Sequence, residues 1–128
     1  MNRQGLVNNY FAGKESPKTI DLKHKLLTSI DSQTFSGLSS LQNLYLNFNN
    51  LICLPNSLFV DLKNLTALYL SFNQLTSLLP AHFSGLTNLS TLDLSYNQLV
   101  SFHPATFNGL INLNWLVLFN NQLSSIDY

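Results

Sequence analysis

The sequence repeats one pattern four times, as LQNLYLNFNNL at 41–51, LTALYLSFNQL at 65–75, LSTLDLSYNQL at 89–99 and LNWLVLFNNQL at 113–123. The copies are spaced by 24 residues, since they begin at residues 41, 65, 89 and 113. Self-similarity at a fixed period of this length indicates a solenoid, in which each repeat contacts only its neighbours. The repeat is therefore the first guide to the fold.

The positions inside each copy predict the architecture. Leucines at the fourth and sixth positions alternate with polar or aromatic residues, which is the periodicity of a strand with one buried face. A strand this short cannot bury its leucines alone, so the copies must stack. The segments between the strands carry one column of Phe and several Pro, which would fill the convex side and interrupt any long helix there: Phe59, Phe83 and Phe107; Pro55, Pro80 and Pro104. We predict an α/β-type solenoid, an arc with a concave parallel β-sheet and an irregular or 3₁₀ convex side.

A column of asparagines occupies the ninth position: Asn49, Asn73, Asn97 and Asn121. A short amide side chain both donates and accepts hydrogen bonds. It therefore satisfies backbone groups where the chain leaves the sheet, within its own coil and toward the next. We interpret this column as a structural ladder.

The repeats also set the domain boundaries. A weaker copy precedes the four, and its apolar residues fill the same positions: Ile20, Leu22, Leu27, Ile30, Phe35 and Leu38. We divide the chain into repeats at 17–40, 41–64, 65–88 and 89–112 with a partial repeat at 113–128, behind an N-terminal capping segment at 1–16. The capping segment would cover the first coil with Leu6, Val7, Tyr10 and Phe11. No such cover is visible at the other end, which would leave Trp115, Leu116, Leu118 and Leu123 near an open end.

The four repeated segments resemble the leucine-rich-repeat signature, over residues 17 to 128. Their 24-residue length and Phe-x-x-Leu convex segment are similar to the typical animal subclass, found in Toll-like receptors, Slit proteins, small proteoglycans and variable lymphocyte receptors. The resemblance implies a leucine-rich-repeat horseshoe that binds another macromolecule and is no enzyme. Secreted members usually carry cysteine-rich caps, and this sequence has none.

Composition and charge narrow the function classes. Charged residues make up 9% of the chain and the formal net charge is zero, which argues against nucleic-acid binding. No stretch approaches the roughly 18 apolar residues needed to insert into a membrane. Residues 1–16 hold no continuous apolar run, so we expect no signal peptide and a cytoplasmic protein if Met1 is native, although the resembled subclass is mostly secreted or at the cell surface.

The candidate binding site is the set of strand residues that point away from the leucines. The third and seventh positions are free in this reading, with Ala67, Ser71 and Ser95 among them, and the fifth runs through Asp21, Tyr45, Tyr69, Asp93 and Val117. The aromatic-rich part of this surface would favour a protein partner. The predicted ligand-binding residues are Tyr45, Tyr69, Asp93, Trp115, Val117, Phe119, Phe48, Phe72 and Tyr96. For Phe48, Phe72 and Tyr96, packing of each ring on its neighbours is an equally open interpretation.

Other reactive residues form no recognisable site. His24, His82 and His103 fall in different positions of different copies, so we predict no metal site, no catalytic residue and no cofactor. Cys53 takes the position of serines in other copies and is expected to be a small packed residue. Two glycosylation tripeptides begin at Asn64 and Asn88, and we interpret them as products of repeat drift.

Three hypotheses for function follow. The first is a non-enzymatic module that binds a protein through its concave face for recognition or adhesion. The second is recognition of a carbohydrate or microbial ligand by the aromatic residues. The third is self-assembly, with homo-oligomers formed through the uncapped C-terminal end.

Overall fold

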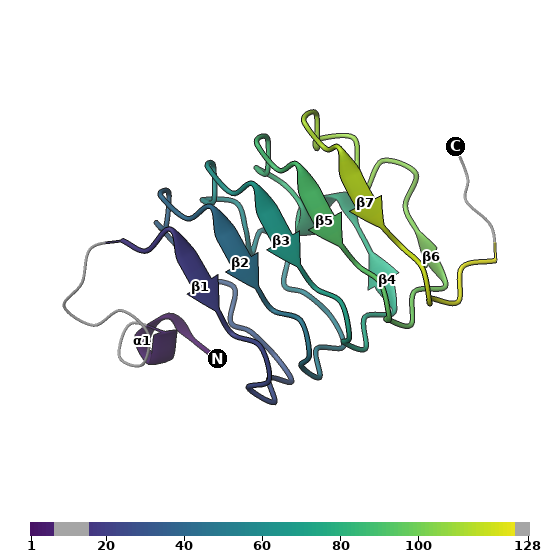
Figure 1. The fold of residues 1–128 in the computed structure, drawn as a ribbon, viewed down its shortest axis with the longest axis horizontal. Coiled ribbons are helices and arrows are strands. Elements are labelled where there is room, and N and C mark those ends of the chain that lie inside the picture. Colours follow the sequence, from purple (N-terminus) through teal and green to yellow (C-terminus); the bar gives the residue numbers. More distant parts are fainter. Residues whose placement is uncertain (7–15, 125–128) are drawn as a thin grey trace.

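The fold is a stack of coils, as seen in the computed structural model of the chain (Figure 1). The structure describes residues 1–6 and 16–124. A short helix, α1 (Arg3–Leu6), precedes the coils. Each coil then contributes one three-residue strand to the main sheet: β1 (Thr19–Asp21), β2 (Asn43–Tyr45), β3 (Ala67–Tyr69), β5 (Thr91–Asp93) and β7 (Trp115–Val117).

The main sheet is parallel, in the order β1-β2-β3-β5-β7, so chain order and spatial order agree. Equivalent positions of successive repeats pair with each other, as Leu44 with Leu68 and Leu68 with Leu92. The middle residue of each strand from β1 to β5 is buried, whereas Leu116 in β7 is 37% exposed. The predicted solenoid with a parallel sheet along its concave side is confirmed. We call the side of the sheet that points away from the leucines the concave face.

The convex side is mostly irregular, with a 3₁₀ turn η2 (Pro80–His82). It also holds a second parallel sheet of two strands, β4 (Ser77–Leu78) and β6 (Ser101–Phe102), which the sequence analysis does not predict. Their register again follows the repeat, since Ser77 pairs with Ser101. The coils are thus in register on both sides of the stack.

A continuous core fills the space between the two sides. The leucine columns are joined there by phenylalanines from the convex segments, and Phe35 stacks on Phe59 with ring centroids 6.2 Å apart. The turn after each phenylalanine is tight. At Gly85, which has φ of +90°, a Cβ atom would lie 2.6 Å from the carbonyl oxygen of Val60, so only glycine fits without a backbone shift.

The two ends of the stack differ. At the N-terminal end, Leu6 is fully buried in the core, and the Met1 carbonyl accepts hydrogen bonds from the Asp31 N–H (2.8 Å) and the Thr34 hydroxyl (3.0 Å). The other proposed capping residues, Val7, Tyr10 and Phe11, lie outside the described residues. At the C-terminal end β7 is the last strand of the sheet (Figure 1). Its backbone edge therefore pairs with no further strand among the described residues.

Candidate binding face

The centre of the concave face is a pair of tyrosines on adjacent strands. Tyr45 and Tyr69 occupy the last position of β2 and β3, and strand geometry turns both away from the core. Their rings lie parallel, with centroids 4.8 Å apart and an interplanar angle of 2°. This centroid distance matches the spacing of neighbouring strands, so each ring stands over its own strand.

Charged groups flank the tyrosine pair on both sides. On the β1 side, the Lys23 ammonium lies 5.0 Å from the centre of the Tyr45 ring and 3.4 Å from the Asp21 carboxylate. On the β5 side, Asp93 is paired in register with Tyr69. The Asp93 Oδ1 atom accepts hydrogen bonds from the backbone N–H (3.0 Å) and the hydroxyl (2.6 Å) of Ser95.

Three residues that the sequence analysis places on the free surface are buried instead. Ala67, Ser71 and Ser95 have between 3% and 9% of their surface exposed. Their side chains are too short to reach past larger neighbours on adjacent strands, and the Ser95 hydroxyl is turned toward Asp93. The accessible part of the concave face is therefore narrower than predicted.

A ladder of rings runs along one edge of the sheet, three residues after the end of each strand. We call His24, Phe48, Phe72 and Tyr96 the ring ladder. Its centroids are 4.6, 4.5 and 4.1 Å apart in that order, with nearly parallel planes. The faces of Phe48 and Phe72 are covered by neighbouring rings, and the edges remain in solvent. The ladder thus packs on itself and still offers an apolar rim.

The last coil carries the most exposed aromatic groups. Trp115 is 69% exposed and Phe119 is 58% exposed, and Val117 between them is half-buried. Phe119 meets Tyr96 edge-on, at 5.5 Å and 83°, and so ends the ring ladder. The aromatic side chains of the face are therefore most exposed in the coil of β7.

Behind this face, the asparagine column fixes the turn that leaves each strand. Asn73 donates from Nδ2 to the carbonyls of Leu70 (3.1 Å) and Leu46 (3.0 Å), and its Oδ1 accepts the N–H of Leu51 (3.0 Å). The coil that it joins is the preceding one, not the following one. The same bonds, to the own and the preceding coil, are made by Asn49, Asn97 and Asn121.

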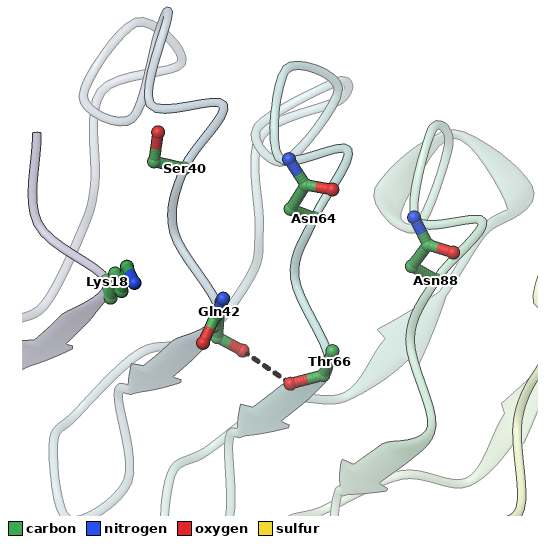
Figure 2. Close-up of a pocket in the computed structure, with 6 residues that line it drawn as sticks. All are labelled: Lys18, Ser40, Gln42, Asn64, Thr66 and Asn88. Atoms are coloured by element: carbon green, nitrogen blue, oxygen red, sulfur yellow. Dashed lines mark hydrogen bonds between the residues drawn. The ribbon is translucent and has the colours of Figure 1, made fainter.

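A second asparagine column, which the sequence analysis treats as repeat drift, lies at the opposite ends of the strands. Nδ2 donates to a carbonyl of the preceding coil at 2.7 Å in each case, as Asn64 to Ser39, Asn88 to Lys63 and Asn112 to Thr87. Figure 2 shows Asn64 and Asn88 beside a polar groove that also contains Lys18, Ser40, Gln42 and Thr66. The recurrence of Asn one residue before each copy, from Asn64 onward, was the signal for this column.

The remaining candidates for chemistry are the histidines, the acidic residues and Cys53. Within residues 1–6 and 16–124, no group of three or more His, Cys, Asp or Glu side chains is placed to hold a metal ion. Cys53 is exposed, as are the equivalent Ser77 and Ser101, so the expectation that it is packed is wrong. The described part of the chain also holds no helix with the length and hydrophobicity needed to span a bilayer.

Comparisons with known proteins agree with this geometry. The sequence model of a family described as Leucine rich repeat matches residues 15–75 and 64–123. The leucine-rich repeat domain of APL1B matches with a TM-score of 0.82 and 31% identity, over 86% of this chain and 34% of that one. A chain of the LRIM1/APL1C complex matches with a TM-score of 0.82 and 32% identity, over 86% of this chain and 21% of that one.

A further match is a chain of the complex of TLR13 with the single-stranded RNA ssRNA13, with a TM-score of 0.75 and 34% identity. It covers 81% of this chain and 14% of that one. The chain therefore spans about a third or less of the length of these solved proteins. No curated protein matched the sequence.

Proposed function

Because the chain belongs to the leucine-rich repeat family, we propose that it is a non-enzymatic module that holds another protein against its concave face. Members of this family are typically binding scaffolds, and two of the similar structures are a complex with a protein and a complex with RNA. The coils supply a rigid support, and the side chains on the concave face supply the contacts.

The observation that carries this proposal is the exposed aromatic surface at β7, together with the tyrosine pair on β2 and β3 of the same face. Trp and Tyr are enriched among residues that dominate the energy of protein interfaces. Trp115 and Phe119 are well exposed, and the Tyr45 and Tyr69 hydroxyls have no hydrogen-bond partner among the described residues. An apolar centre with hydrogen-bonding groups beside it is the usual anatomy of a protein interface.

The same geometry makes a carbohydrate or an RNA a poorer fit. A sugar ring stacks on an open aromatic face. In the ring ladder the faces of Phe48 and Phe72 are covered, and the open Tyr69 face and the exposed Trp115 lie on strands that β5 separates. A single-stranded nucleic acid requires a positively charged groove. The cation on the concave face of the described residues is the Lys23 ammonium, which already pairs with the Asp21 carboxylate.

Self-association is a second candidate, favoured by one specific observation. Leu116 stands in the leucine column, where its counterparts in β2, β3 and β5 are fully buried, yet it is 37% exposed. An open sheet edge with apolar side chains is a template for pairing with another chain. Light scattering over a concentration series tests this, and a monomer at every concentration rejects it.

The test of the main proposal is affinity capture by the intact protein and by a double variant. Tyr69→Ala with Trp115→Ala removes two rings from the concave face and leaves the leucine core in place. We expect captured proteins to be lost with little change in melting temperature. The matched control is Ile52→Ala with Val60→Ala, which removes exposed apolar groups elsewhere. Equal capture by wild type and the concave-face variant would reject the proposal.

A further inference from the structure

The concave face contains one complete cation site built from this chain's own residues. Lys23 bridges the Asp21 carboxylate, at 3.4 Å, and the face of the Tyr45 ring, at 5.0 Å from its centre. An ammonium group between a carboxylate and an aromatic face gains both an ion pair and a cation–π contact. The tyrosine pair is thus already used to bind a cation on its β1 side.

The other side of the tyrosine pair has the same parts without the cation. The rings of Tyr45 and Tyr69 are parallel, so the second face of Tyr69 points along the sheet toward β5. Asp93 lies there, because it is paired in register with Tyr69 and falls in the same column as Asp21. No ring or cation covers that face of Tyr69 among the residues that the structure describes.

The sequence explains why the second site has no cation of its own. Lys23 follows Asp21 by two residues, and the residue that follows Asp93 by two is Ser95. Ser95 occupies Oδ1 of Asp93 with two hydrogen bonds and orients the carboxylate, while Oδ2 has no partner among the described residues. In that part of the chain the Lys23–Asp21 pair is the only salt bridge, so the Asp93 charge is uncompensated.

We propose that the concave face binds an arginine side chain of its protein partner between the Tyr69 ring and the Asp93 carboxylate. Arginine fits better than lysine, because a planar guanidinium stacks on an aromatic face while it donates in its own plane to a carboxylate. On the far side of Asp93, in register with it, lies Val117, and Trp115 lies in register with Thr91. Partner side chains that neighbour the arginine on the β7 side would therefore contact these apolar groups of the present chain. This inference rests on the proposed function of the concave face.

The test is an NMR titration of the ¹⁵N-labelled full chain with N-acetyl-arginine amide, and with N-acetyl-citrulline amide as its neutral counterpart. The arginine derivative should shift the amide signals of Tyr69, Asp93 and Ser95. Its affinity should exceed that of the citrulline derivative by about fivefold, as expected for one solvent-accessible ion pair with a cation–π contact. Equal shifts with both compounds, or shifts elsewhere on the molecule, would overturn the proposal.

Variants separate this site from a general effect of charge. Asp93→Asn keeps an oxygen for Ser95 and removes the charge, so it should lower arginine affinity to the citrulline level. Tyr69→Phe should preserve binding, and Tyr69→Leu should weaken it. Asp31→Asn is the matched control, because its oxygen still accepts the Gln33 N–H and it lies outside the sheet. A loss of affinity in Asp31→Asn as large as in Asp93→Asn would contradict a local site.

The two proposals fail separately. If captured proteins depend on Tyr69 and Trp115 but arginine amide does not bind, the concave face is an interface that uses other chemistry. If arginine amide binds as described and no protein depends on the concave face, the cation site stands and the proposed function falls.

Discussion

At the scale of single residues, the eighth position of each repeat has an unusual backbone. His24, Phe48, Phe72, Tyr96 and Asn120 all have φ between 53° and 59°, in the left-handed region. This conformation costs an L-residue about 1–2 kcal/mol. The turn that leaves each strand imposes it in every coil, whatever the side chain, and also in the first coil, where Lys25 takes the place of the asparagine.

This backbone separates two effects of the ring ladder. Phe72→Ala and Phe72→Gly both remove the ring that stacks on Phe48 and Tyr96. We expect both to lower the free energy of unfolding by about 1–3 kcal/mol. Glycine should be at least as stable as alanine, because only glycine adopts positive φ without strain. Urea denaturation measures the difference.

The exposed Ile52, which has no positive φ, supplies the control. There Ile52→Ala should be more stable than Ile52→Gly by about 0.5–1 kcal/mol. The same order at both positions would show that the left-handed backbone carries no cost.

Residues also show where sequence reasoning stops. The asparagine column at the ninth position and the outward tyrosines follow from position in the repeat. The burial of Ser71 and Ser95 does not, because it depends on how far neighbouring side chains reach across the sheet. Nor does repeat position reveal that Asp93 lacks a cation while Asp21 has one, since that depends on the path of the Lys23 side chain.

At the scale of elements, the strands of the main sheet were predictable and those of the convex side were not. Three-residue strands with a middle leucine or isoleucine, buried in β1, β2, β3 and β5, recur in register with the repeat. The pair β4 and β6 has two residues each, too few to show alternation. They form because coils that are in register on one side bring equivalent segments together on the other.

The 3₁₀ turn η2 gives the protein a pH-dependent element. His82 is buried, and its Nδ1 accepts the N–H of Leu79 at 3.0 Å, which only a neutral imidazole nitrogen can do. Burial lowers the pKa of His82 below its ordinary value of 6.5. The unfolded chain therefore takes up the proton first, and the free energy of unfolding should fall as the pH drops below 6.5, down to the lower pKa of the folded state.

Thermal or urea unfolding between pH 7.5 and 5, in roughly the range where histidine titrates, would measure this. His82→Gln should flatten the pH dependence, because it removes the buried imidazole that accepts the Leu79 N–H. An unaltered slope in His82→Gln would contradict the assignment.

At the scale of the whole molecule, the first and last coils of the described residues differ in burial. Leu6 and the Met1 carbonyl cover the first coil, whereas Trp115 and Leu116 face solvent at the last. Within the described residues, the last coil packs against a neighbour on one side only, which accounts for the exposure of its leucine.

Equivalent leucines should therefore contribute unequally to stability. Leu68→Ala, in the fully buried middle of β3, should lower the free energy of unfolding by about 2–5 kcal/mol. Leu116→Ala, at the same position of β7, should cost about 1 kcal/mol, since part of its surface is already in water. Chemical denaturation of the two variants checks this, and equal losses would mean that the last coil is covered in solution.

The constant register between coils has a consequence for how such a protein can evolve. Because every interior coil meets its neighbours through the same backbone and asparagine bonds, recombination can delete or duplicate a whole coil and leave the core intact. The same event does, however, change which side chains are neighbours on the concave face. Loss of residues 65–88 would bring Tyr45 beside Asp93 and abolish the phenol pair, so a single genetic event could give the same scaffold a different specificity.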